Sequence, residues 1–106
     1  MAGQGARKSR QANADLIEIA CFLIQESGTH ALGERFLTLA EFGVQTLVEF
    51  PQVGHSVAWS RKALKGIRSW QVPGFPQYLI FYRVTGSGIL VIRVLHSSRN
   101  FRSRLF

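Results

Sequence analysis

The C-terminal half of this 106-residue chain has no acidic side chain. Residues 50–106 carry nine Lys or Arg and no Asp or Glu, whereas residues 1–49 carry all six acids and four Lys or Arg. The net charge of +7 therefore originates entirely in the second half. This absence excludes a pair of catalytic carboxylates from residues 50–106, and it indicates an acidic protein segment or a nucleic acid as the partner.

Cysteine is almost absent as well. Cys21 is the only one, so the chain can form no intrachain disulfide and no cysteine-rich zinc site. It lies in an apolar helical run, where we expect a buried and inert thiol. His30, His55 and His96 lie on different predicted elements, and the glycines at 86–88 precede a strand rather than a helix. We therefore expect no metal site and no bound cofactor.

Long apolar runs are also missing. Asp15 and Glu18 interrupt the only apolar stretch near the N-terminus, so neither a secretory signal nor a membrane span is expected. The length suits one domain over residues 1–106, and the hydrophobic content of 46% is enough for a packed core. The sequence thus predicts a single cytoplasmic domain without membrane contact.

Two amphipathic helices are predicted in the first half. The first begins at about Ala12 and ends at Ser27-Gly28, where glycine suits the left-handed residue after a helix. The second begins after a capping Thr29 and stops at Pro51. Its predicted buried stripe comprises Leu32, Phe36, Leu39, Gly43, Leu47 and Phe50. So short a connection predicts an antiparallel helical hairpin.

Three strands are predicted in the second half, at residues 67–72, 78–84 and 89–96. A loop over residues 51–64 precedes them, residues 73–76 separate the first two strands, and residues 85–88 form a hairpin turn between the last two. Helices followed by strands indicate an α+β fold, with the helical hairpin on one face of a small, mainly antiparallel sheet.

Both faces of this sheet are predicted to be apolar. Strict alternation of side chains along a strand places Tyr78, Ile80 and Tyr82 on one face of the sheet. On the strand at residues 89–96 it places Val91 and Arg93 on the same face as each other. A two-residue turn places Ile80 opposite Arg93 unless a bulge intervenes. Two helices cover one face only. The tail with Leu105 and Phe106 and the 52–64 loop, a second copy of the protein, or a partner chain could cover the other.

Basic and aromatic side chains are the remaining candidates for a functional site. Arginines on a rigid sheet can bind carboxylates or phosphates bidentately. Alternatively, Arg68, Arg83 and Arg93 can pair with helix acids such as Asp15, Glu18 and Glu41. The predicted partner-binding residues are Arg68, Trp70, Tyr82, Arg83, Arg93, His96, Arg99, Arg102 and Arg104. An alternative catalytic set, Arg83, His96 and Arg99, could cleave RNA, with His96 moving a proton.

Several short motifs occur in a characteristic order along the chain. They are Asp15-Leu16 with Glu18-Ile19-Ala20, Phe50-Pro51-x-x-Gly54, Ile67-Arg68, Tyr78-Leu79-Ile80-Phe81-Tyr82-Arg83, and Arg93-Val94-Leu95-His96-Ser97-Ser98-Arg99. Over about Ala12 to Arg99 the chain resembles the ParE branch of the RelE/ParE toxins of bacterial type II toxin–antitoxin modules. The resemblance implies a β-α-α-β-β-β order and a cognate antitoxin lying across the second sheet face.

The resemblance also bears on mechanism. RelE-type members cleave messenger RNA on the ribosome with lysines on the strand after the helices, an arginine on the next strand, and a C-terminal arginine and tyrosine. Here residues 67–72 lack lysine, Leu79 follows Tyr78, and no tyrosine follows Tyr82. The resemblance therefore implies a ParE-type toxin that inhibits DNA gyrase by binding, without enzymatic activity or direct sequence-specific DNA binding. The alternatives are a RelE-type ribosome-dependent endoribonuclease and a decayed toxin that only binds antitoxin.

The two ends of the chain are the least regular parts of this prediction. Residues 4–9 are polar where the family's first strand is normally apolar, so residues 1–11 are expected to form a weak edge strand or a flexible arm. Residues 97–106 form a basic tail ending after Arg104. We expect this tail to contribute to antitoxin and target contacts.

Overall fold

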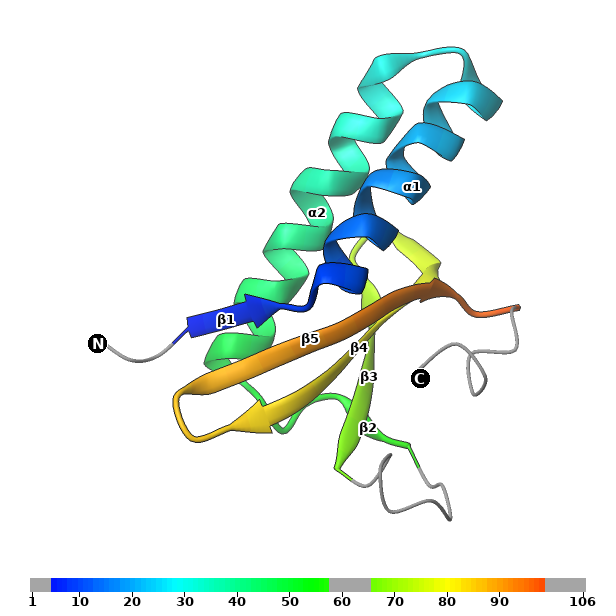
Figure 1. Ribbon diagram of the computed structural model, residues 1–106. Helices are drawn as coiled ribbons and strands as arrows, with labels where there is room; N and C mark the ends of the chain where they lie inside the picture. The colour runs from blue at the N-terminus through cyan, green and yellow to red at the C-terminus, as the bar shows by residue number, and fades with distance from the viewer. Residues whose placement is uncertain (1–4, 58–65, 99–106) are drawn as a thin grey trace.

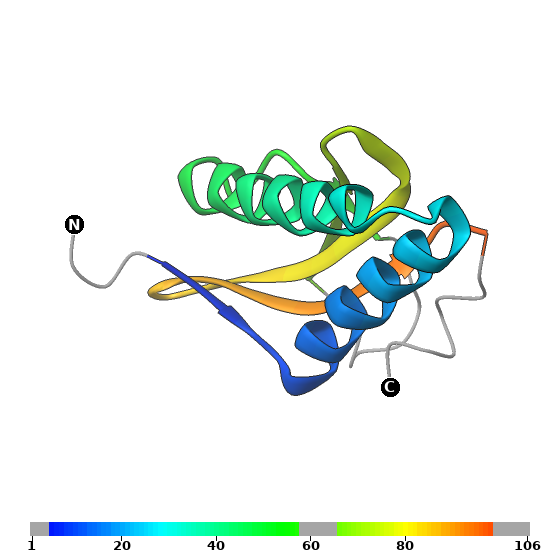
Figure 2. The ribbon, with the colours of Figure 1, turned by 90° about the horizontal axis from the view of Figure 1, so that it is seen from above.

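The computed structural model describes residues 5–57 and 66–98, which form two helices and five strands (Figure 1). In chain order these are β1 (Gly5–Lys8), α1 (Arg10–Ser27), α2 (His30–Glu49), β2 (His55–Ser56), β3 (Ile67–Val72), β4 (Phe75–Thr85) and β5 (Gly88–His96). The sheet has the order β1-β5-β4-β3-β2 and is antiparallel except between β1 and β5. Both helices lie on one face of it (Figure 2), which confirms the predicted α+β architecture.

The helices begin and end at the predicted kinds of residue. Ser9 caps α1 by accepting the Ala12 N–H at 3.0 Å, so the helix starts at Arg10, slightly earlier than its apolar pattern indicates. The Ser9 hydroxyl also donates to the Ile92 carbonyl at 2.7 Å, which fixes the start of α1 against β5. Gly28 ends α1 with a φ of 74°, and Thr29 caps α2.

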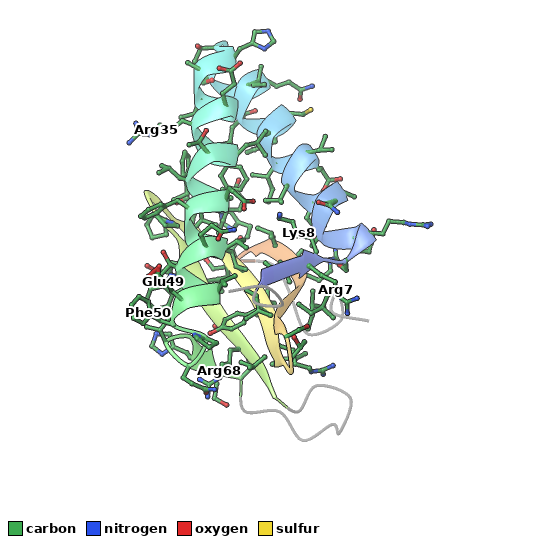
Figure 3. The ribbon with its side chains drawn as sticks, turned by 90° about the vertical axis from the view of Figure 1, so that its left-hand side faces the viewer. Arg7, Lys8, Arg35, Glu49, Phe50 and Arg68 are labelled. Carbon is green, nitrogen blue, oxygen red and sulfur yellow. The ribbon has the colours of Figure 1, made fainter. Side chains whose placement is uncertain are left out.

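The predicted weak first strand exists as β1, at the edge of the sheet. It runs parallel to β5, from Gly5 opposite Gly88 to Lys8 opposite Val91. Its polar residues are compatible with this position because an edge strand needs few core contacts. Of its residues, only Ala6 packs against the main core. Lys8, labelled in Figure 3, forms an ion pair with Glu41 at 3.1 Å. Gly88 cannot carry a side chain here, because an added Cβ would overlap the Gly5 carbonyl.

The main core lies between the helices and the sheet. Phe36 of α2 is fully buried, and its ring meets Phe75 and Tyr78 edge-on at centroid distances of 5.3 Å each. Two expectations for the helices are wrong. Phe50, expected to be buried, is 59% exposed (Figure 3), because α2 ends at Glu49 and the chain turns away there. Cys21, also expected to be buried, is exposed.

A β-bulge at Ile92 changes which residues of β5 face the helices. The pairing runs from Phe81 opposite Arg93 directly to Tyr82 opposite Val91, so Ile92 has no cross-strand partner. Val94 consequently joins Val91 in the main core, and Ile80 lies opposite Val94 rather than Arg93. Strict alternation along β5, which grouped Arg93 with Val91, was therefore wrong beyond the bulge.

The second face of the sheet carries its own small apolar cluster, as predicted. Ile67, Phe81 and Leu95 are buried there, and Val57, Leu79 and Ile92 pack around them. Val57 belongs to the segment expected to fold over this face, whereas Leu105 and Phe106 lie outside the described residues. Among the residues that the structure describes, no helix is long and apolar enough to cross a membrane.

Candidate functional site

A buried ion pair joins α1 to β5. The Asp15 carboxylate accepts hydrogen bonds from Arg93 Nε at 2.7 Å and Arg93 Nη2 at 2.9 Å, and from the Val94 N–H at 3.0 Å. The carboxylate raises the pKa of the Arg93 guanidinium by accepting these bonds. Because Arg93 is only 8% exposed, it positions α1 on the sheet and does not present its charge to a partner, contrary to its predicted binding role.

A second polar cluster fixes the turn that follows α2. Tyr82 donates its hydroxyl proton to the Pro51 carbonyl at 2.8 Å and accepts the Gly54 N–H at 2.9 Å. Arg68 donates from Nη1 to the Gly54 carbonyl at 2.7 Å and to the Gln52 carbonyl at 3.2 Å. Gly54 has no room for a Cβ, which would meet the Tyr82 ring at 2.7 Å and 2.9 Å. Tyr82 is thus a buried structural residue rather than the predicted binding contact.

Because the Tyr82 hydroxyl is buried, the free energy of unfolding depends on pH in the alkaline range. Burial raises the pKa of Tyr82 above its ordinary value, while the Gly54 N–H and the Arg68 charge oppose this rise. Above pH about 10 an unfolded tyrosine loses its proton before the folded one does, so the free energy of unfolding falls as pH increases.

We expect Tyr82→Phe to cost about 1–2 kcal/mol at pH 8, because it leaves the Gly54 N–H without its acceptor. The wild-type chain should then lose more stability than the variant between pH 8 and pH 11. Guanidinium unfolding at both pH values measures this difference. Equal losses in the two proteins would contradict the inferred pKa shift.

The alternative catalytic set is not assembled. Arg83 lies opposite Leu90 on β5, whereas His96 lies six residues further along that strand, opposite Tyr78. At about 3.3 Å per residue the two positions are about 20 Å apart, so one phosphate cannot contact both. This separation excludes a shared active site of Arg83 and His96. The predicted contacts Arg99, Arg102 and Arg104 lie outside the described residues.

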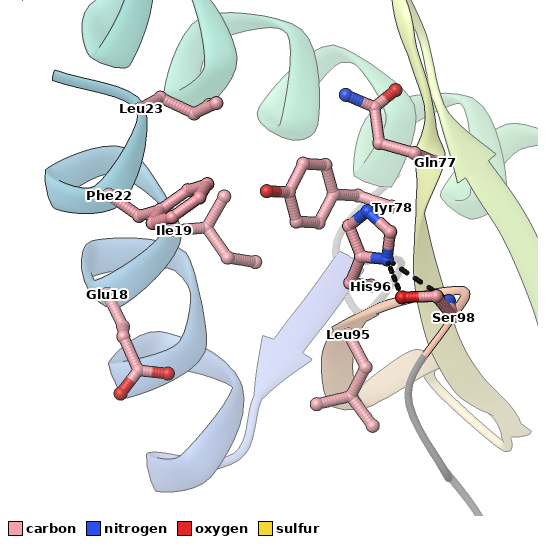
Figure 4. Close-up of a pocket in the computed structure, with 9 residues that line it drawn as sticks. All are labelled: Glu18, Ile19, Phe22, Leu23, Gln77, Tyr78, Leu95, His96 and Ser98. Atoms are coloured by element: carbon pink, nitrogen blue, oxygen red, sulfur yellow. Dashed lines mark hydrogen bonds between the residues drawn. The ribbon is translucent and has the colours of Figure 1, made fainter. Parts of the chain in front are cut away.

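His96 instead borders a pocket of about 400 Å³ between α1 and the adjoining ends of β4 and β5 (Figure 4). The pocket is lined by Glu18, Ile19, Phe22, Leu23, Gln77, Tyr78, Leu95, His96 and Ser98. His96 Nδ1 accepts a hydrogen bond from the Ser98 N–H at 3.1 Å and lies 2.7 Å from Ser98 Oγ. The His96 ring also packs edge-on against the ring of Tyr78. Its buried lining residues, Ile19, Leu23, Tyr78 and Leu95, are mainly apolar, and such a lining suits an apolar side chain of a partner.

This pocket is better suited to binding than to catalysis. Ser98 lies only two residues after His96, so its contacts with the His96 ring belong to the local turn. Glu18, the acidic residue of the pocket, lies on α1, across the pocket from His96 (Figure 4). A serine nucleophile would need its histidine oriented by a third group. Among residues 5–57 and 66–98, no group of three or more potential ligands could hold a metal ion.

Sequence reasoning located His96 but missed most of its neighbours. Phe22 lies in the first predicted helix, Ser98 in the predicted basic tail, and Gln77 just before the predicted strand at 78–84, so no local signal united them. No sequence signal marked Phe22, because its exposure of 51% is known only from the structure. Trp70, another predicted contact, lines a separate hollow at the other side of β4, beside β3.

Comparisons with known proteins agree with this architecture. A solved structure described as the chromosomal ParDE TA system from P. aeruginosa matches 90% of this chain and 98% of its own, with a TM-score of 0.71 and 18% sequence identity. This likeness shows that the two chains share a fold. A search of curated proteins found no match.

The family assignment follows from the sequence itself. Residues 7–101 match the family model of the ParE toxin of the type II toxin–antitoxin system parDE. This match spans nearly the whole chain and includes both helices and all five strands except the first residues of β1. The chain belongs to the ParE toxin family.

Proposed function

We propose that this ParE-family chain arrests bacterial growth by binding DNA gyrase, and that a cognate antitoxin holds it inactive. The observation that supports a binding mechanism is the separation of Arg83 and His96, at opposite ends of the β4–β5 pair. The sheet also lacks lysine on β3 and any carboxylate from residue 50 onward. The chemistry for RNA cleavage is therefore not gathered at one place among the described residues.

The proposed contacts divide into two groups: residues that the structure describes, and residues of the tail that are proposed from the sequence alone. Trp70 and His96 border hollows on the surface, and Arg68 bonds only neutral carbonyls through Nη1, so its charge is available to an acidic partner. Arg99 and the basic tail to Arg104 stay proposed contacts on sequence grounds. The antitoxin is proposed to cover the second sheet face, where Leu79 and Ile92 are only half-buried.

Induced expression of the chain alone in a bacterium tests this function. We expect growth arrest with loss of negative supercoiling of a reporter plasmid, and the purified chain should inhibit supercoiling by purified gyrase. Co-expression of the antitoxin encoded beside the toxin should restore growth. The reporter plasmid in uninduced cells is the control.

Two results would contradict the proposal. Growth arrest with unchanged supercoiling and newly cleaved translated messages would identify a RelE-type endoribonuclease. Normal growth despite abundant soluble protein, combined with no effect on purified gyrase, would identify a decayed toxin.

A further inference from the structure

The side of α2 that points away from its buried stripe carries three exposed residues at equal spacing. Arg35, Phe42 and Glu49 follow one another at intervals of seven residues. Seven residues make almost two helical turns, so the three side chains leave the helix within about 40° of one another. Figure 3 shows Arg35 and Glu49 projecting to the same side of the helix, away from α1. These three residues define the outer row of α2.

Phe42 lies at the centre of the outer row. It is 63% exposed, more than any other large apolar side chain that the structure describes. Its neighbours along the same side are uncharged, with Thr38 and Gln45 exposed and Thr46 half-buried. An aromatic ring in water at the middle of a helix face is unfavourable, and a partner surface that covers it is stabilised by the burial.

The charges at the two ends of the row have no partner in the described part of the chain. Within residues 5–57 and 66–98, neither Arg35 nor Glu49 forms an ion pair. Arg35 is the only Lys or Arg of α2. Glu49 is the last residue of α2, where the negative end of the helix dipole disfavours a carboxylate. An arginine brought to Glu49 from another molecule would offset this unfavourable placement.

A second copy of this chain supplies that arginine when it is turned end for end. Arg35 precedes Phe42 by as many residues as Glu49 follows it, which is about 10.5 Å along the helix in each direction. A two-fold axis at Phe42 therefore places Arg35 of each copy beside Glu49 of the other, and it brings the two Phe42 rings together. Parallel pairing would instead place Arg35 beside Arg35 and Glu49 beside Glu49.

We propose that free copies of this chain form a two-fold symmetric dimer by antiparallel pairing of α2, centred on Phe42. Phe50 adjoins Glu49 and is 59% exposed (Figure 3), so its ring lies beside the incoming Arg35. The contact is a single helix pair, smaller than a standard interface, and it should give a Kd of roughly 100 μM. The dimer does not depend on gyrase being the toxin's target.

Sedimentation velocity of the full chain, prepared by cell-free synthesis, tests the association over a range of about 5–500 μM. We expect the mass to rise from that of one chain to that of two. Phe42→Ala should weaken dimerisation at least about tenfold, because it removes the centre of the contact. Phe22→Ala is the matched control, since it removes a ring of 51% exposure from α1 and should leave the Kd within about twofold of wild type.

Exchanging the two charges tests the register. Arg35→Glu sets carboxylates against each other twice in the dimer, and Glu49→Arg does the same with guanidinium groups, so each should weaken dimerisation at least about tenfold at low salt. The double variant, Arg35→Glu with Glu49→Arg, restores opposite charges and should return the Kd to within about threefold of wild type. Both positions are exposed, so the fold should tolerate all three variants.

A cysteine at the two-fold axis tests the direction of pairing. In a Cys21→Ser background, Phe42→Cys places the two thiols at the axis, close enough for a disulfide. Thr38→Cys, on the same side of α2, places them eight residues apart along the paired helices, or about 12 Å. Under a mild oxidant we expect the first variant to form a covalent dimer and the second to stay monomeric on a non-reducing gel.

Four outcomes would overturn the proposal. They are a chain that stays monomeric over the whole concentration range, equal effects of Phe42→Ala and Phe22→Ala, no rescue by the double charge variant, and cross-linking of Thr38→Cys in preference to Phe42→Cys. The first would assign the outer row to a different protein partner or to solvent, and the last would assign the dimer to another pairing of α2.

Discussion

Replacing Asp15 by alanine is expected to lower the free energy of unfolding by about 3–5 kcal/mol. The change leaves the Arg93 guanidinium buried, at 8% exposure, without the carboxylate that accepts two of its hydrogen bonds. It also removes the acceptor of the Val94 N–H. The site offers little water to replace these partners, so the charge stays poorly solvated in the folded state. Urea unfolding of the purified variant measures the loss.

The ion pair between Lys8 and Glu41 provides a matched control. Its Glu41 side chain is 51% exposed, so Glu41→Ala should cost no more than about 1 kcal/mol. A double variant, Asp15→Leu with Arg93→Met, should recover most of the stability that Asp15→Ala loses, because it removes both buried charges and keeps the volume. A small effect of Asp15→Ala, or no recovery in the double variant, would show that the pair is not the main link between α1 and β5.

Phe36→Ala is expected to cost about 3–5 kcal/mol. Phe36 is fully buried, and its ring contacts both Phe75 and Tyr78 edge-on, so the variant leaves a cavity where α2 meets the sheet. Both ring contacts come from β4, which is anchored on either side by other strands and cannot close the cavity easily. Thermal and urea unfolding should both shift, with a lower Tm and a lower midpoint.

Phe42 on the same helix is the control for this prediction. It is 63% exposed, so Phe42→Ala should change the free energy of unfolding by no more than about 0.5 kcal/mol. The two variants remove the same atoms from the same helix and differ only in burial. Similar losses for both would mean that helix propensity, rather than core packing, determines the effect.

The sequence was informative wherever a local pattern determines the structure. Apolar spacing and the caps Thr29 and Gly28 located both helices to within a few residues. The two-residue turn between β4 and β5 formed as predicted, with Thr85 opposite Gly88. The pairing of a sheet arginine with a helix acid was among the alternatives, with Asp15 named beside Glu18 and Glu41, and the structure shows it for Arg93 and Asp15.

Features that depend on distant residues could not be predicted. The sequence of β5 gives no sign of the bulge at Ile92. The bulge nevertheless moves the side chains that follow it to the opposite faces of the sheet from those that strict alternation predicts. Tyr82 and Arg93 have the polar groups of binding residues, and only their tertiary partners, Pro51 and Asp15, show that they act inside the fold. The pocket at His96 joins α1 to two strand ends that lie more than fifty residues later in the chain.

The parallel pairing of β1 with β5 also has a consequence for synthesis. Gly5 to Lys8 find their partners only at Gly88 to Val91, so the first strand stays unpaired until β5 has left the ribosome. The Ser9 and Asp15 contacts with β5 form equally late. A growing chain therefore cannot complete its sheet before β5 has been made, and α1 stays without its contacts on β5 until then.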